Sequence, residues 1–340
     1  MQHSICRSLG WLGTAALALA SAPAVAEPAK VAQGAAADLG VMGISLKDAV
    51  KLNYGIQGQL QGAGTPNEAG IGAFVPLKVN KNSVWFLDAL ANANFGDYSG
   101  YSSIGDTEVA GTTISTSTRL GYRWLNSNRS WMYGINAGYD SRPMATGGTT
   151  NGVVVDKSRT VFYNQVAFNA EAKSNRWSAS AYGLIPVGQY GLGSGKVATI
   201  NSAYGADPLT TLGIDIGYNI VPAVQLAVGY YYQTCEKEPP TFPSGAEGSG
   251  VKMRLAYDIT QQLQAGVSYS YDANFQSRVN GDLKWRFGSG DNTKRIQLST
   301  PPAIKALSVA PANRDVRVAN SQCADGTRYI GPACIIVTKP

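Results

Sequence analysis

The feature that most constrains the fold of this 340-residue chain is a strict alternation of bulky apolar residues with small or polar ones. Between positions 224 and 233, Val, Leu, Val, Tyr and Tyr alternate with Gln, Ala, Gly, Tyr and Gln. Residues 212–219 and 263–272 repeat the pattern. Because side chains alternate between the two faces of a strand, a period of two predicts β-strands with one apolar face.

Twelve segments carry this alternation and predict an all-β protein. They are 53–63, 69–79, 84–95, 112–124, 131–142, 159–172, 176–188, 212–219, 224–233, 249–259, 263–272 and 277–287. After residue 26 the sequence has no run of 18 or more apolar residues, which a membrane-spanning helix requires. The sequence therefore favours strands over helices as any membrane-crossing element.

The connections between these segments alternate in length. Short ones (80–83, 125–129, 173–175, 220–222, 260–262) alternate with long ones (96–111, 143–158, 189–208, 236–248). Bacterial outer-membrane barrels have short periplasmic turns and long extracellular loops. A soluble β-sandwich is the alternative, but it needs a charged surface, and only 15% of these residues are charged against about 25% in soluble domains. We therefore predict a 12-stranded antiparallel outer-membrane β-barrel with a short C-terminal extension.

Aromatic residues are expected to mark the membrane interfaces. Five tryptophans lie on the apolar parity, each near a strand end assigned to the periplasm: Trp85, Trp124, Trp131, Trp177 and Trp285. Phe95, Tyr139, Tyr232 and Tyr271 lie near the opposite strand ends. Such belts are typical of membrane barrels, and these residues predict two aromatic girdles.

The opposite parity carries charges of both signs and is predicted to face the lumen. Its members are Asp88, Arg119, Arg123, Asp140, Arg142, Glu171, Asp215, Lys252, Arg254, Asp258, Asp272, Asp282, Lys284 and Arg286. These charges can pair with one another, line a narrow aqueous channel, or hold a polar plug. The sequence leaves these three alternatives open.

The N-terminal residues resemble an export signal. Arg7 precedes the apolar residues 9–20, and Ala24-Val25-Ala26 forms a cleavage site, which predicts a signal peptide over 1–26 and a periplasmic segment over 27–51. The only histidine, His3, falls within the signal peptide, so the expected mature chain lacks the imidazole of familiar hydrolase triads. We expect no enzymatic activity, no catalytic residue, no cofactor and no metal site.

One stretch resembles a known family. Gly121-Tyr122-Arg123-Trp124-Leu125, followed by Ser130 to Asp140 (SWMYGINAGYD), resembles consecutive strands of the β-domain of the intimin and invasin family, the inverse autotransporters. Residues 159–188 look like the following hairpin, and Leu283 to Phe287 looks like the aromatic-ended strand that the barrel-assembly machinery recognises. The resemblance covers roughly residues 69–290 and implies a twelve-stranded barrel that exports a C-terminal segment, and the alternating segments predict that the barrel spans 52–288.

The last segment, 289–340, is predicted to be a linker and tail in which basic residues outnumber acidic ones. Cys323 and Cys334 flank Asp-Gly and Gly-Pro turn signals, which predicts a small disulfide-closed loop, and Cys235 is left as a single thiol. The basic tail suits a solvated linker or docking to an acidic lumen wall, lipopolysaccharide or another surface polymer. Lipid and the assembly machinery are expected partners, nucleic acid is not, and a surface ligand stays unidentified.

Two functions remain open at this stage. One is a barrel that translocates or displays its own C-terminal segment, and the other is a porin-like diffusion channel or a structural barrel. They differ in whether residues 288–322 pass through the lumen or stay in the periplasm. Fully extended, these residues span up to roughly 115 Å, against about 40 Å for a bilayer with its headgroups. Their length is therefore sufficient for a crossing.

Overall fold

The computed structural model describes residues 41–60, 67–95, 113–145, 160–188, 198–199, 204–234, 248–260, 262–272, 276–288, 302–323, 327–330 and 333–336. The chain divides into one unit of residues 1–43 and a second unit of residues 44–340, which contains the fold described below. The predicted signal peptide and Cys235 lie outside the described residues.

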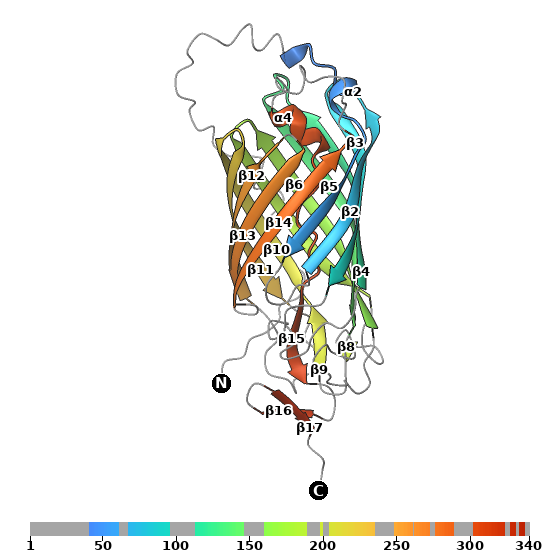
Figure 1. Cartoon of the computed structure of the whole chain (residues 1–340), viewed down its shortest axis with the longest axis vertical. Coiled ribbons are helices and arrows are strands. Elements are labelled where there is room, and N and C mark those ends of the chain that lie inside the picture. The colour runs from blue at the N-terminus through green and yellow to red at the C-terminus, as the bar shows by residue number, and fades with distance from the viewer. Residues whose placement is uncertain are drawn as a thin grey trace, which may run out of the picture. The chain divides into compact units, whose positions relative to one another are not determined.

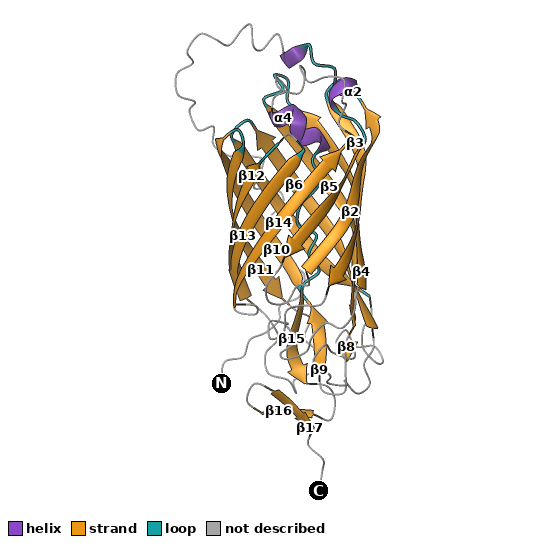
Figure 2. Cartoon of the chain, in the orientation of Figure 1, coloured by secondary structure: helices purple, strands orange, loops and turns teal. Residues whose placement is uncertain are grey.

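Among the described residues, twelve strands close into a single antiparallel barrel (Figures 1 and 2), which confirms the predicted fold. They are β1 (Asn53–Leu60), β2 (Asn67–Val79), β3 (Ser83–Phe95), β4 (Thr113–Leu125), β5 (Trp131–Ala145), β6 (Thr160–Ser174), β7 (Trp177–Val187), β10 (Thr210–Val221), β11 (Val224–Thr234), β12 (Gly248–Asp258), β13 (Leu263–Asp272) and β14 (Gln276–Phe287). Each pairs with the next barrel strand along the chain, and β1 closes on β14 from Tyr54↔Phe287 to Leu60↔Gly281. Closure leaves the sheet no free edge, which the interior of a bilayer requires.

The outer face of the barrel is apolar along every strand. Large exposed side chains there include Ile71, Leu120, Ile135, Phe168, Ile214, Val228, Leu255, Val267 and Leu283. They occupy alternate positions, so the same alternation that forms each strand also separates a lipid-facing surface from a polar interior. Among the described residues, no helix is long and apolar enough to cross a membrane.

The barrel has two rims of different character. Short turns such as 80–82, 175–176 and 222–223 join strands at one end, here called the short-turn rim. The connections at the other end, the long-loop rim, are longer, except for 273–275 between β13 and β14. By the rule for bacterial barrels the short-turn rim faces the periplasm and the long-loop rim the cell exterior. The barrel begins at Asn53 and ends at Phe287 on the short-turn rim, because its strand number is even.

Short helices occupy the short-turn rim. Helix α2 (Leu46–Ala49) contacts α4 (Pro302–Lys305), which continues into the 3-10 turn η2 (Ala306–Ser308). Pro302 begins α4, a position where the missing N–H and fixed φ of proline are tolerated. Arg129, which is buried, donates from Nη1 to the carbonyl oxygen of Ile44 (2.6 Å) and from Nη2 to that of Lys81 (2.9 Å), and so ties the segment before β1 to two turns.

A second sheet lies at the long-loop rim and was not predicted from the sequence. The connection between β7 and β10, expected to be a plain loop, contains β8 (Ala198–Thr199) and β9 (Tyr204–Pro208). The sheet order is β15-β9-β8, and β15 (Val318–Cys323) comes from the C-terminal tail. A separate hairpin follows, made of β16 (Thr327–Ile330) and β17 (Ala333–Ile336). The C-terminal segment therefore has α4 at one rim and β15 at the other (Figure 1).

Candidate functional site

Residues 302–318, here called the lumen segment, contact the inner wall of the barrel along its length. Its first part, α4 and η2, is apolar and buried: Ala303, Ile304, Ala306 and Leu307 are at most 3% exposed. Two buried wall rings at the same rim, Phe74 of β2 and Phe86 of β3, stack with their centroids 5.0 Å apart. This apolar end is where burial of hydrocarbon contributes most to holding the segment.

Arg123 of β4 joins the wall to the end of η2. Its guanidinium lies 4.5 Å from the centroid of the Phe86 ring and donates from Nε to Oε1 of Glu171 (2.8 Å). From Nη1 it donates to the carbonyl oxygens of Leu307 (3.1 Å) and Val309 (2.6 Å). Those carbonyls, at the end of a helical turn, have no helical partner, so a buried arginine satisfies them.

Asn313 holds the middle of the lumen segment between opposite walls. Its φ of 56° is left-handed, a conformation that asparagine tolerates better than most residues. Its Oδ1 accepts from Lys252 Nζ (2.9 Å) and its Nδ2 donates to Asp215 Oδ2 (3.2 Å), while its backbone oxygen accepts from Arg119 Nη2 (3.3 Å). Lys252 and Asp215 also pair directly at 2.9 Å, so the amide spans an existing ion pair with matched donor and acceptor.

Arg314 pairs with the wall on the β3–β4 side. Its guanidinium forms an ion pair with the buried carboxylate of Asp88 and donates from Nη1 to Ser117 Oγ (2.8 Å). Its Nε donates to the carbonyl oxygen of Pro311 (3.0 Å), which fixes the local bend of the segment. A buried carboxylate needs such a partner, because an unpaired charge in this environment is costly.

Buried arginines of the wall hold the part nearest the long-loop rim. Arg142 Nη1 donates to the carbonyl oxygen of Val316 (2.8 Å), and Gln165 Nε2 donates to that of Asp315 (3.2 Å). Arg119 and Asp140 form a two-bond ion pair (2.6 and 2.8 Å) beside them.

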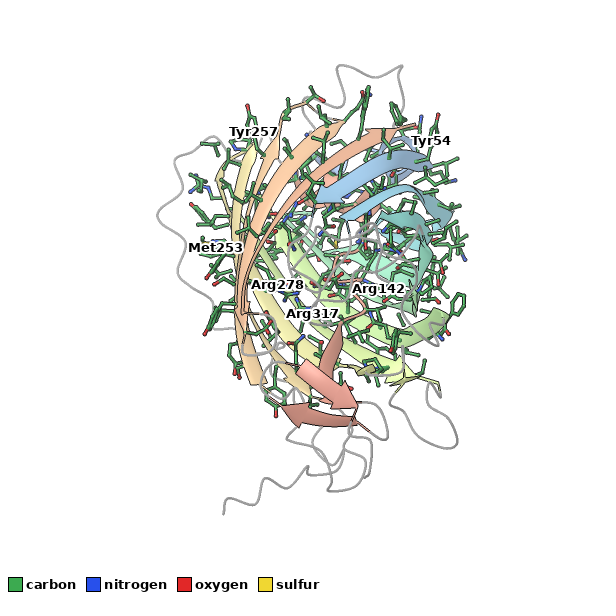
Figure 3. All side chains as sticks on the ribbon, turned by 60° about the horizontal axis from the view of Figure 1, so that its bottom comes forward. Tyr54, Arg142, Met253, Tyr257, Arg278 and Arg317 are labelled. Atoms are coloured by element: carbon green, nitrogen blue, oxygen red, sulfur yellow. The ribbon has the colours of Figure 1, made fainter. Side chains whose placement is uncertain are left out.

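Arg317 contacts the opposite side of the lumen wall, on β11 and β13. It lies 3.8 Å from the Asp272 carboxylate and 4.5 Å from the centroid of the Tyr231 ring. Tyr231 donates to Asp272 at 2.6 Å, and Arg278 reaches the same carboxylate at 3.2 Å. In Figure 3 the labelled Arg142, Arg278 and Arg317 lie inside the barrel, whereas Tyr54, Met253 and Tyr257 stand on its outside. The segment then leaves the lumen as β15, paired with β9 from Val318↔Pro208 to Cys323↔Tyr204.

A cavity of about 1110 Å³ remains beside the lumen segment. Its wall carries Arg254, Asp282, Lys284 and Arg286 of β12 and β14, which the lumen segment does not bond directly among the interactions described. No group of acidic, histidine or cysteine side chains that could hold a metal ion occurs among the described residues.

The sequence-predicted lumen residues are thus placed in two sets. Those that bond the lumen segment directly are Asp88, Arg119, Arg123, Arg142, Asp215, Lys252 and Asp272. The others, Asp140, Glu171, Arg254, Asp258, Asp282, Lys284 and Arg286, line the cavity, where Asp140 and Glu171 also support bonding arginines. The buried ring pair of Phe74 and Phe86 was not predicted, although both residues lie on the lumen parity, near Gly72 and Asp88.

The five predicted girdle tryptophans lie at or near strand ends on the short-turn rim. Trp85, Trp177 and Trp285 are about half exposed (44%, 51% and 45%), while Trp124 and Trp131 are partly covered and lie against Tyr133. Of the predicted disulfide pair, Cys323 ends β15 and Cys334 lies in β17, and their side chains are outside the described set.

Comparison with known proteins supports the fold. No protein-family description matches the chain, and no characterised protein sequence matches it. A solved chain from a study of in-meso crystallization of membrane proteins matches with a TM-score of 0.54 and 12% identity, covering 78% of this chain and 99% of that one. An outer membrane channel from Pseudomonas putida matches with a TM-score of 0.45 and 14% identity (70% and 96% covered), and outer membrane phospholipase A from Escherichia coli with 0.36 and 12% (69% and 96%).

The closed twelve-stranded sheet, its apolar outer face and the likeness to the first of these chains define the class of the protein. It is an outer-membrane β-barrel.

Proposed function

We propose that this barrel carries its own C-terminal segment through its lumen and presents the residues after Val318 at the cell surface. The observation that carries the proposal is the path of residues 302–323. They begin as a helix at the short-turn rim and end as β15, paired with a strand from a connection at the long-loop rim. This pairing supports a crossing of the lumen, because a strand that is hydrogen-bonded to an external loop lies on the external side.

The character of the contacts supports a permanent arrangement rather than a transient one. An apolar end (α4 and η2), a central amide clamp (Asn313) and two ion pairs (of Arg314 and Arg317) follow one another along the segment. These contacts have fixed partners on the barrel wall, so movement of the segment along the barrel axis would break all of them together. Polar groups that pair with one another inside a protein favour a single position of the segment that carries them.

The resemblance of residues 119–142 to the inverse autotransporters agrees with this proposal, since in that family a barrel exports the segment that follows it. The proposed role needs no catalytic residue, cofactor or metal. On this reading the part of the tail after Val318, with Cys323 and Cys334 closing a small loop, is the functional surface, and it carries Arg328 and Lys339 against Asp325.

A diffusion channel is the second candidate, and the cavity of about 1110 Å³ favours it. In that case the lumen segment would act as a constriction that sets pore size. The two candidates share the same strands and differ in whether the tail reaches the outside.

The test is the accessibility of an epitope added after Pro340. On intact cells we expect antibody to bind this epitope and external protease to remove it. The matched control carries the same epitope in the turn at Ser127, an exposed residue on the short-turn rim, where binding should require permeabilised cells. A C-terminal epitope that is reached only after permeabilisation, like the control, would exclude display and leave the channel.

A further inference from the structure

A β-bulge near the end of β2 turns one lysine onto the outer face of the barrel. The pairing of β2 with β3 up to Pro76, if continued, would set Lys78 opposite Val84. Val84 is 0% exposed, so the ammonium group would be buried there without a partner, which is costly. The register shifts between Pro76 and Lys78, and Lys78 pairs instead with Trp85 and is exposed. One extra residue in a strand thus re-aims the side chain that follows it.

The outer face changes from hydrocarbon to charge at this bulge. Leu77 is 55% exposed, Lys78 follows it directly, and Trp85 on the neighbouring strand is 44% exposed. Opposed Cβ atoms of antiparallel strands are about 4.5–5.5 Å apart, so the lysine stands beside the indole. Trp85 contacts Tyr122 with the ring centroids 4.9 Å apart, as part of the aromatic girdle. Because girdle aromatics lie at the level of the lipid headgroups, the ammonium group of Lys78 lies at that level too.

The turn after the bulge presents a second cation and is held in place. Lys81 is exposed, and its backbone carbonyl accepts a hydrogen bond from the buried Arg129 (2.9 Å). Asn80 Nδ2 donates to Ser83 Oγ (3.0 Å) across the same turn. In the part of the chain that the structure describes, the ammonium groups of Lys78 and Lys81 have no ion-pair partner. The hairpin therefore offers two unneutralised positive charges on a fixed backbone.

The rest of the described short-turn rim has the same sign of charge. Its exposed cations are Lys47, Lys51, Lys78, Lys81, Arg176 and Lys305, and its exposed carboxylates are Asp48 and Asp258. Arg176, in the turn between β6 and β7, directly precedes the girdle residue Trp177. Such an excess of positive charge at the level of the headgroups attracts anionic lipids.

We propose that the hairpin of β2 and β3 binds the phosphate group of an anionic phospholipid of the periplasmic leaflet through Lys78 and Lys81. A lipid is the occupant that fits, because Lys78 lies on the lipid-facing wall between Leu77 and the aromatic girdle. A lysine close to an anionic membrane surface strengthens association about fivefold, and the effect fades over a Debye length of about 10 Å. The proposal goes beyond display and depends on the barrel wall alone, not on the path of the tail.

The experiment uses the full chain in nanodiscs of phosphatidylcholine with a small fraction of phosphatidylglycerol that carries a photoreactive group on its headgroup. Mass spectrometry, after a protease that does not recognise lysine, locates the cross-links. We expect them at residues 77–85, with a yield several-fold higher than for phosphatidylcholine carrying the same group. Lys78→Gln should lower the yield about fivefold, and Lys78→Arg should retain it.

Lys305→Gln is the matched control, because it removes an exposed cation of the same rim that lines the lumen cavity instead of the lipid-facing wall. Its cross-linking yield should equal that of the wild type. In 1 M sodium chloride, where the Debye length is about 3 Å, the preference for phosphatidylglycerol should largely disappear.

Each variant is first checked for the compact, heat-modifiable form of a folded barrel, so that a folding defect is not mistaken for lost lipid binding. Equal yields for the two lipids, or a yield in Lys78→Gln that equals the wild type, would overturn the proposal. An equal loss in Lys305→Gln and Lys78→Gln would also overturn it, because the cause would then be the overall charge of the rim. The C-terminal epitope on intact cells reports display separately, since neither result depends on the other.

Discussion

Replacing Asn313 tests whether the lumen segment is held at its centre. Asn313→Gly keeps the left-handed backbone at φ 56° but removes the bonds to Lys252 and Asp215. Hydrogen bonds to charged groups contribute about 1.5–3 kcal/mol each. Because Lys252 and Asp215 stay paired at 2.9 Å, the lower figure applies, and the two bonds together contribute about 3 kcal/mol. Asn313→Ala adds roughly 1 kcal/mol, since a Cβ is disfavoured at positive φ.

Native-state hydrogen exchange of residues 309–318 in detergent micelles measures this docking free energy directly. When local opening is fast and reversible, the exchange rate follows the equilibrium between docked and undocked segment. A loss of about 3 kcal/mol corresponds to exchange about 150-fold faster in Asn313→Gly, and about fivefold faster again in Asn313→Ala. The amide exchange rates of the barrel strands should be the same in these variants as in the wild type.

Ala312→Ser is the control, because Ala312 is exposed in the cavity next to the clamp. Its exchange should match the wild type. If Asn313→Gly, Asn313→Ala and Ala312→Ser all exchange like the wild type, the lumen segment does not depend on the amide, and the clamp derived from these contacts is wrong.

Three further changes test other parts of the structure. Ile214→Arg, on the lipid face near mid-strand, should cost about 2–4 kcal/mol in folding titrations into vesicles, whereas Gln225→Arg, on the cavity wall, avoids this cost; equal costs would reverse inside and outside. Arg129→Ala should speed amide exchange of residues 44–52 by roughly tenfold to 100-fold, because the charged hydrogen bond to the carbonyl oxygen of Ile44 is lost, and unchanged exchange would show that this bond does not hold the segment. If Cys323 and Cys334 are joined, non-reducing mass mapping of the wild type should recover one linked peptide, and two free thiols would reject the loop.

The alternation predicted the barrel well because the membrane itself imposes it. Every strand must present an apolar face to lipid, so each membrane-crossing strand carries its own alternating pattern in the sequence. An even number of antiparallel strands also allows β14 to pair with β1 and close the barrel. The boundaries differ from the predicted ones by a few residues at strand ends, where lipid contact ceases and the pattern weakens.

The sequence contains no alternating pattern that would predict the second sheet. The strand β9 reads Tyr-Gly-Ala-Asp-Pro and β15 reads Val-Ala-Asn-Ser-Gln-Cys, and neither alternates. Each is a strand only because the other, 110 or more positions away in the chain, pairs with it, as Val318↔Pro208 and Cys323↔Tyr204 show. Pairing between distant segments is decided by tertiary context, which local propensity does not carry.

The sequence predicted which charged residues face the lumen but not which residues they bond. Parity identified Asp88, Arg119 and Lys252 as inward-facing residues, yet it left open whether they pair, line a channel or hold a plug. Their partners, Arg314 and Asn313, come from the tail, and only the folded path of the tail brings them together. Among the lumen-facing positions, Gly213 does not suit the arginine substitution described above, because a Cβ there would lie 2.4 Å from the Tyr182 ring, whereas Gln225 already carries a side chain.

The central claim, that the tail crosses the barrel, is tested most directly by a spin-label distance in lipid nanodiscs. One label is placed on a cysteine that replaces Ser127 on the short-turn rim and the other on Cys323 at the end of β15, with Cys235 and Cys334 replaced by serine. Barrel strands of about twelve residues, tilted by about 40°, separate the rims by about 30 Å. We predict a narrow distribution at or above that distance. A broad distribution centred below about 20 Å would place β15 on the side where the barrel begins and contradict the account.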